Sequence, residues 1–176
     1  MPAPTVSEIE KAIRNVPDFP KPGIQFKDIT PLLADARLFA GTIDLLTDGF
    51  KPGSVDAVVG IDARGFIFAA AAAIKLDAGF VPVRKIGKLP FQTIQQDYAL
   101  EYGSATVAMH IDALKSGARV LLIDDLLATG GTAAAATSLV EKLGGKILEV
   151  SFLIELGFLN GREKLKQYPI RSLVTY

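Results

Sequence analysis

The chain has 176 residues, 49% of them hydrophobic, with 19 basic and 19 acidic side chains. This length predicts a single domain with a substantial core, because it is too short for two domains of ordinary size. A net charge of zero provides no overall field toward nucleic acid or an anionic membrane. The absence of cysteine excludes disulfides, thiol catalysis and cysteine-based zinc sites.

The chain also lacks the sequence features of a membrane or exported protein. Its longest apolar run, Phe66 to Ile74, is too short to cross a bilayer. Residues 1–16 contain no signal-peptide core. We therefore expect a cytoplasmic protein that binds neither a membrane nor nucleic acid.

The N-terminal third predicts two helices separated by a proline-broken arm. Ser7 and Glu10 have the spacing of a capping box, so a short amphipathic helix is expected up to Pro17. The arm, residues 18–31, carries apolar side chains that favour packing of an extended segment onto a core. Residues 37–50 then have helical periodicity and end at a Lys-Pro-Gly terminator.

A strand-to-helix junction follows at residues 62–65. A buried strand is predicted over residues 55–61 and an apolar helix over residues 66–76. The first N–H groups of this helix and the guanidinium of Arg64 can converge on an anion. The alternative is that Arg64 only forms a surface ion pair with Asp62.

A third strand, predicted over residues 78–83, is followed by Arg84, Lys85 and Lys88. These three cations could equally lie on a solvated edge. The polar segment from Gly87 to Asp97 is long enough to predict a lid or binding loop. A strand is expected over residues 105–111, and its His110 is interpreted as structural.

The second junction, residues 124–132, is the most informative segment. A buried strand, Val120 to Ile123, precedes Asp124 and Asp125, and a helix is predicted from Thr132 to Leu143. The turn between them can direct backbone N–H groups at a phosphate, because glycine leaves no side chain in the way. Carboxylates accept hydrogen bonds, so their partners would be sugar hydroxyls or a divalent cation. The segment therefore predicts a phosphorylated-sugar site, with a simple helix-capping turn as the alternative.

The remaining elements complete an α/β pattern. A strand over residues 145–155, a short helix over residues 160–168 and a final strand over residues 170–175 are predicted. Alternating strands and helices predict a central, mainly parallel sheet flanked by helices, with ligands at the carboxyl ends of the strands. The glycine patterns of P-loop and dinucleotide-binding proteins are absent.

Residues 120–132, VLLIDDLLATGGT, resemble the phosphoribosyl-pyrophosphate (PRPP) motif of the type I phosphoribosyltransferases, in the form found in members that use adenine. The resemblance implies the fold of that family, with a small N-terminal hood (about residues 17–34), a core (about 36–176) and a flexible lid loop (about 85–104). It also implies that Asp124 and Asp125 hold the ribose hydroxyls. The 5′-phosphate would be wrapped by Ala128, Thr129, Gly130, Gly131 and Thr132.

Other segments resemble further motifs of the same family. The GIDARGF and RKIGKLP segments resemble its pyrophosphate-binding parts, FPKPGIQFKDITPLL resembles its base-covering hood, and LEYG resembles its lid base. The resemblance implies that Phe26 stacks on adenine, that Gln25 and Lys27 read the purine edge, and that Leu156 lines the base site. Glu101 would handle the proton of the purine imidazole ring. The implied pyrophosphate contacts are Asp62, Ala63, Arg64, Arg84, Lys85 and Lys88.

The function implied by the resemblance is the conversion of adenine and PRPP to AMP and pyrophosphate. It further implies a homodimer and a Mg²⁺ ion held mainly by PRPP and water, with no protein ligand assigned. Two alternatives stay open. One is transfer to another purine base, and the other is a non-catalytic regulator of the same fold that senses PRPP.

Overall fold

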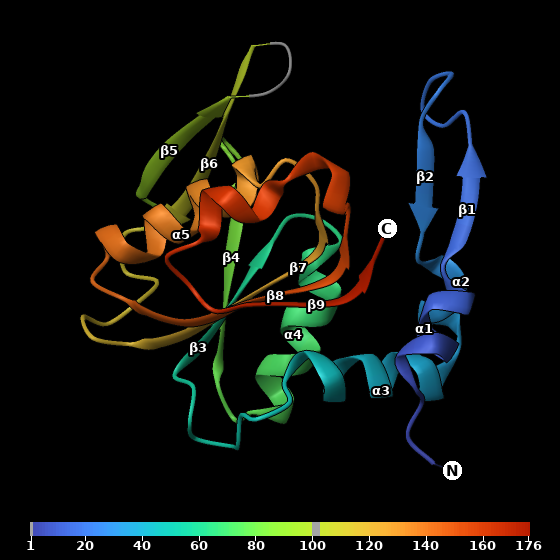
Figure 1. Ribbon diagram of the computed structural model, residues 1–176. Helices are drawn as coiled ribbons and strands as arrows, with labels where there is room; N and C mark the ends of the chain where they lie inside the picture. Colours follow the sequence, from blue (N-terminus) through green and yellow to red (C-terminus); the bar gives the residue numbers. More distant parts are fainter. Residues whose placement is uncertain (1, 100–102) are drawn as a thin grey trace. The chain divides into compact units, whose positions relative to one another are not determined.

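The structure is a computed structural model that describes residues 2–99 and 103–176 (Figure 1). It divides into two compact units, Met1–Leu45 and Leu46–Tyr176. Each unit is described by itself below. The predicted arrangement of hood, core and lid within one domain stays a prediction.

The first unit begins with helix α1 (Val6–Ala12), whose cap differs from the predicted one. Thr5 is the N-cap residue, and its side chain accepts a hydrogen bond from the backbone N–H of Glu8. The Glu8 carboxylate in turn accepts from the Thr5 backbone N–H at 2.9 Å. The prediction of Ser7 and Glu10 as the capping pair was therefore wrong by two residues, because Thr5 and Glu8 have the same spacing.

A β-hairpin occupies part of the segment predicted as helix end and extended arm. Strands β1 (Arg14–Pro17) and β2 (Gln25–Asp28) pair antiparallel, with Arg14 opposite Asp28. An ion pair of 2.6 Å between these two side chains closes the hairpin. Helices α2 (Thr30–Ala34) and α3 (Ala36–Leu46) follow, and α3 confirms the helix predicted from residue 37, although it ends four residues earlier.

The second unit is built on a seven-stranded sheet with the order β5-β6-β4-β3-β7-β8-β9. Strands β4, β3, β7, β8 and β9 run parallel, whereas β6 pairs antiparallel with β4 and with β5. The predicted α/β fold with a mainly parallel central sheet is therefore confirmed. The strands are β3 (Ala57–Ile61), β4 (Gly79–Lys85), β5 (Thr93–Ala99), β6 (Ser104–His110), β7 (Arg119–Leu127), β8 (Lys146–Glu155) and β9 (Ile170–Thr175).

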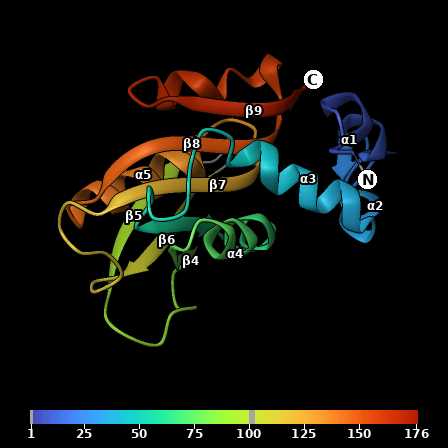
Figure 2. The ribbon, with the colours of Figure 1, turned by 90° about the horizontal axis from the view of Figure 1, so that it is seen from below.

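Helices α4 (Gly65–Lys75) and α5 (Gly131–Lys142) cover opposite faces of this sheet (Figures 1 and 2). Side chains alternate along a strand, so neighbouring residues face opposite layers. In β3, Val59 belongs to the core layer that includes the α5 alanines. At the next position, a Cβ on Gly60 would meet Ala69 of α4 at 2.7 Å. Gly60 therefore lets α4 approach the sheet closely.

The amino ends of β3 and β7 are joined by one charged pair. The guanidinium of Arg119 donates to Asp56 Oδ1 at 2.8 Å and Oδ2 at 3.0 Å, and to the carbonyl of Gly53 at 2.7 Å. The backbone N–H of Arg119 also donates to Asp56 Oδ2 at 2.7 Å. These hydrogen bonds lower the pKa of Asp56 to about 2. The pair thus links the amino ends of the two central strands.

Two predictions about local structure in the second unit need correction. The last five residues of the segment predicted as a lid loop, Thr93–Asp97, belong to strand β5, which pairs with β6 from Thr93 opposite His110. The helix predicted over residues 160–168 is instead the short 3-10 helix η2 (Gly161–Leu165), which another 3-10 helix, η1 (Gly157–Leu159), precedes. Among the helices that the structure describes, none is long and apolar enough to cross a membrane.

Candidate active site

The site lies at the point in the parallel sheet where the strand order reverses. From β3 the chain passes through α4 to β4 on one side, and from β7 it passes through α5 to β8 on the other. In open α/β sheets, ligands bind at the carboxyl ends of the strands at such a switch point. Here the switch point lies between β3 and β7, the strands that precede the two predicted anion-binding junctions.

Strand β7 extends beyond its neighbour β3 at this end. The pairing of β3 with β7 ends at Gly60 opposite Ile123, whereas β7 continues along β8 as far as Leu127 opposite Glu155. Asp124 and Asp125 therefore lie inside the strand, and the prediction that the strand ends at Ile123 was wrong. Since β3 no longer pairs with β7 there, the acidic pair lies next to the β3–α4 junction.

Arg64 connects the two junctions. Its Nε lies 2.8 Å from Asp125 Oδ2, and the Asp125 side chain is only 8% exposed. Asp62, the partner that the sequence analysis considered for Arg64, accepts from Arg84 Nε at 2.9 Å. Arg84 also donates to the carbonyl of Lys88 at 3.0 Å. The peptide bond between Asp62 and Ala63 is cis.

The folded protein disfavours ionisation of both carboxyl groups of the acidic pair. Burial raises the pKa of Asp124 well above its usual value, and the neighbouring Asp125 carboxylate raises it further. Burial also raises the pKa of Asp125, against the opposing effect of the Arg64 charge. One hydrogen bond offsets part of this effect, from the Asp125 backbone N–H to Asp124 Oδ1 at 2.9 Å. A bound cation or sugar hydroxyls would relieve more of it.

The turn before α5 has the geometry expected for a phosphate site. Gly130 has φ of 76°, a conformation that favours glycine, and no side chain caps the helix that starts at Gly131. The first N–H groups of α5 have no carbonyl partner within the helix. They lie beside a small cavity of about 80 Å³, lined by Asp124 and residues 126–133. The structure thus brings Ala128, Thr129, Gly130, Gly131 and Thr132 together around one hollow.

A larger cavity of about 380 Å³ joins both junctions. Its lining includes a residue that the sequence analysis did not single out, Tyr98 from β5. A Cβ on Gly131 would lie 3.2 Å from the Tyr98 ring, so β5 packs directly against the start of α5. The signal for Tyr98 was its position three residues before Glu101. The full lining is Ile61, Asp62, Ala63, Arg64, Tyr98, Asp124, Asp125, Leu126, Ala128 and Thr132.

Of the described residues, the other cations predicted to bind pyrophosphate do not line the cavity described above. Lys85 ends β4 and is exposed, as is Lys88. Glu101 lies outside the described residues. His110 is half-buried and accepts a 3.4 Å hydrogen bond from the Phe91 backbone N–H, consistent with a structural residue.

The predicted base-binding residues belong to different units. Gln25, Phe26 and Lys27 lie on β2 of the first unit, where the Phe26 ring packs edge-on against Phe19 at 5.1 Å. The Gln25 side chain accepts from Asn15 Nδ2 at 2.6 Å. Leu156 lies in the second unit, where its N–H donates to the carbonyl of Leu127 at 2.9 Å. Leu156 is thus tied to the strand that carries the acidic pair.

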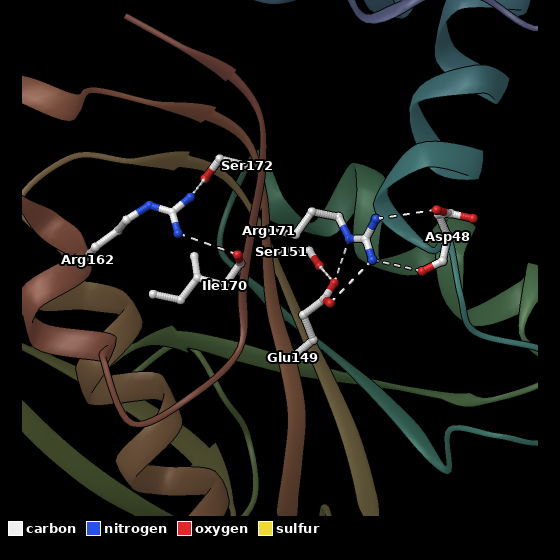
Figure 3. A network of polar contacts seen from close by, with 7 residues as sticks. All are labelled: Asp48, Glu149, Ser151, Arg162, Ile170, Arg171 and Ser172. Atoms are coloured by element: carbon white, nitrogen blue, oxygen red, sulfur yellow. Dashed lines mark hydrogen bonds and ion pairs between the residues drawn. The ribbon is translucent and has the colours of Figure 1, made fainter.

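An ion pair near Leu156 was also missed from the sequence. Glu155, the last residue of β8, is 6% exposed. Both its oxygens accept from Arg162 Nε, at 2.7 Å and 2.9 Å. Figure 3 shows the same guanidinium directed at Ser172 of β9, whose Oγ accepts at 3.2 Å. In the same view Arg171 contacts Glu149 at 2.7 Å and the carbonyl of Asp48 at 2.9 Å.

No group of three or more His, Asp or Glu side chains within residues 2–99 and 103–176 could hold a metal ion. The carboxylates that line the cavity are Asp62, Asp124 and Asp125, and Asp62 and Asp125 each contact an arginine. A hard cation such as Mg²⁺ takes carboxylate, phosphate and water oxygens. The donor chemistry therefore fits a Mg²⁺ ion that a polyphosphate substrate brings with it.

Together, the switch-point cavity, the acidic pair and the glycine turn define an α/β protein that binds a phosphorylated sugar. Comparison with known proteins agrees. Residues 25–174 match the family described as "Phosphoribosyl transferase domain". The "Adenine phosphoribosyltransferase" of Acidothermus cellulolyticus is 54% identical over 175 residues, which are 99% of each chain.

Solved structures show the same likeness. The adenine phosphoribosyltransferase of Rhodothermus marinus has a TM-score of 0.92 and 50% identity, covering 97% of this chain and 98% of that one. The Saccharomyces cerevisiae enzyme, complexed with an imino-altritol bisphosphate and adenine, has a TM-score of 0.90 and 41% identity, covering 96% and 97%. This chain belongs to the phosphoribosyltransferase family, and within it to the adenine phosphoribosyltransferases.

Proposed function

We propose that this protein transfers the 5-phosphoribosyl group of PRPP to adenine, which yields AMP and pyrophosphate. The observation that carries the proposal is the single cavity that joins the acidic pair to both anion-binding junctions. The adenine bound in the similar yeast structure supports adenine as the base. The names of the relatives at 52–56% identity support the same reaction.

The proposed binding mode assigns one end of PRPP to each junction. The 5′-phosphate would occupy the turn of residues 128–132, where backbone N–H groups and the Thr129 and Thr132 hydroxyls can donate. The pyrophosphate would lie at residues 62–64, with Arg84, Lys85 and Lys88 as further cations. The ribose hydroxyls between them would donate to Asp124 and Asp125.

The acidic pair has a second proposed role, in the transition state. As the bond from ribose C1′ to pyrophosphate lengthens, the sugar gains positive, oxocarbenium-like character. Ionised Asp124 and Asp125 stabilise that charge from a fixed position, because neighbouring hydrogen bonds and Arg64 already orient them. N9 of adenine then forms the new bond to C1′, and Glu101 would accept the proton from the purine imidazole ring.

We propose that Phe26, Gln25, Lys27 and Leu156 bind the base, and that closure of the lid keeps water from the reacting carbon. Mg²⁺ would neutralise the leaving pyrophosphate. It would be held mainly by substrate oxygens and water, with Asp62, Asp124 and Asp125 as the carboxylates of the same cavity. The homodimer and the cytoplasmic location stay predictions.

The test is turnover with adenine, hypoxanthine, guanine and xanthine in parallel, each with PRPP and Mg²⁺. Formation of AMP from adenine, at a rate far above the other three, is expected. Faster transfer to another base would assign the protein to a different purine. PRPP binding without product from any base would favour the regulatory alternative.

A further inference from the structure

The short helix η2 lies directly against the phosphate turn. A Cβ on Gly161 would overlap the carbonyl oxygen of Ala128, and it would lie 3.0 Å from Leu127 Cδ1 and 3.1 Å from Gly130 N. In the other direction, a Cβ on Gly130 would overlap the Gly161 carbonyl oxygen and lie 3.1 Å from its carbonyl carbon. The two backbones are therefore in contact with no side chain between them.

Residues that follow Gly161 in η2 hold it in place. Arg162, the next residue, is held by both oxygens of the nearly buried Glu155 and by Ser172 Oγ. At the other end of the helix, Leu165 is fully buried in the core beneath α5. Gly161 is thus anchored to β8, β9 and the core within five residues.

Besides Gly161, the turn of residues 128–132 is supported at its ends, by Tyr98 of β5 packed against Gly131 and by the pairing of β7 with β8. Strand β3 has ended, so β7 pairs only with β8 beyond Ile123, and that pairing stops at Leu127 opposite Glu155. No side chain caps α5. The position of the Ala128 carbonyl and the Gly130 N–H therefore depends on the backbone of Gly161.

We propose that Gly161 is a positioning residue for the 5′-phosphate, held in place by the Arg162–Glu155 ion pair. The inference rests on the proposed function in one respect, that the turn of residues 128–132 receives the phosphate of the sugar. A site made of backbone N–H groups binds through its geometry, because it has no flexible side chain to adjust. A methyl group at Gly161 would overlap the Ala128 carbonyl oxygen and displace the turn, so the affinity for the phosphate should fall.

The test compares Gly161→Ala with wild type by calorimetric titration with ribose 5-phosphate and, separately, with pyrophosphate. We expect affinity for ribose 5-phosphate to fall at least tenfold, while affinity for pyrophosphate changes less than twofold. In steady-state kinetics, KM for PRPP rises by a similar factor and KM for adenine does not.

Gly79→Ala is the matched control. Gly79 starts β4, and a Cβ there would meet only the Asp56 carbonyl oxygen, at an ordinary 3.6 Å. We expect it to keep wild-type affinity for both ligands. A loss of ribose 5-phosphate affinity equal to that of Gly161→Ala would overturn the inference.

A second variant tests the anchor without adding volume at the turn. Arg162→Lys keeps a positive charge beside Glu155 but loses the planar fork that reaches Ser172. We expect a threefold or larger loss of ribose 5-phosphate affinity, with the far-ultraviolet circular dichroism of wild type. This variant decides the matter if Gly161→Ala does not fold.

The outcomes separate the inference from the proposed function. Unchanged ribose 5-phosphate affinity in folded Gly161→Ala, or an equal loss for pyrophosphate, would overturn the positioning role. If wild type binds ribose 5-phosphate but forms no nucleotide from PRPP and any purine, the proposed function fails. The positioning role would still stand if the selective loss is then observed.

Discussion

Asp124→Asn should make the protein more stable and less active at the same time. Burial and the adjacent Asp125 raise the pKa of Asp124, so the ionised form is disfavoured in the folded state. A raised carboxyl pKa contributes stability that is fully present below the unfolded value of 3.8 and is lost as the pH rises through the folded pKa. At neutral pH, asparagine removes this cost and its Oδ1 can still accept from the Asp125 N–H.

The size of the gain follows from the same contacts. Two unit charges about 6 Å apart repel by about 3 kcal/mol at an effective dielectric constant near 20, and nearby Arg64 offsets part of that. Relief of strain at active sites commonly gives about 0.5 to 2 kcal/mol. For a chain of 176 residues, this corresponds to a rise in Tm of roughly 1 to 8 °C.

The assay is thermal unfolding of both proteins across a pH series, together with turnover of adenine. The difference in Tm should be small near pH 4 and should grow toward neutral pH, while turnover falls more than tenfold. A variant that is less stable than wild type at neutral pH would refute the electrostatic reasoning. Increased stability with unchanged turnover would refute the proposed role of Asp124 in the reaction.

Asp125→Asn should leave the circular dichroism intact and cut turnover more than tenfold, since a hydrogen bond to a charged group contributes about 1.5 to 3 kcal/mol. Unchanged steady-state kinetics would contradict that role. Glu101→Gln should lower kcat with little change in PRPP affinity, and an equal loss of both would indicate a binding role. Thr5→Ala should destabilise α1 by about 1 kcal/mol in denaturant unfolding, whereas Ser7→Ala should have little effect, because only Thr5 caps the helix.

The sequence was sufficient for the parallel core because its signals are local. The buried strands are short apolar runs rich in branched residues, and α5 is followed by the glycine pair Gly144-Gly145. The first hairpin was missed because each of its strands has only four residues and the loop between them contains two prolines. The pairing of Val16 with Phe26 is therefore not visible as a pattern in the sequence. Strand β5 was missed because its polar side chains read as a loop, although its backbone pairs with β6 throughout.

The candidate site was predictable as a set of segments but not as a set of contacts. The junction at residues 62–65 was predicted from Arg64 at the start of a helix, and the junction at residues 124–132 from the glycines after a buried strand. The partner of Arg64 could not be predicted, because Asp62 is its neighbour in sequence whereas Asp125 comes from the adjacent strand. Gly161 gave a weaker signal, an Asn-Gly pair after a strand, and its contact with Gly130 depends on how β8 packs beside β7.

The pairing of Asp56 with Arg119 helps to keep β3 and β7 in register, and the distance between Arg64 and Asp125 at the other end of these strands depends on that register. A slip of one residue between β3 and β7 would move their carboxyl ends past each other by about 3.3 Å. That distance exceeds the 2.8 Å between Arg64 and Asp125, so the slip would separate them and turn the following side chains to the wrong face. Substitution of Arg119 should therefore weaken sugar-phosphate binding from the far end of the two strands, although no residue that touches the ligand has been replaced.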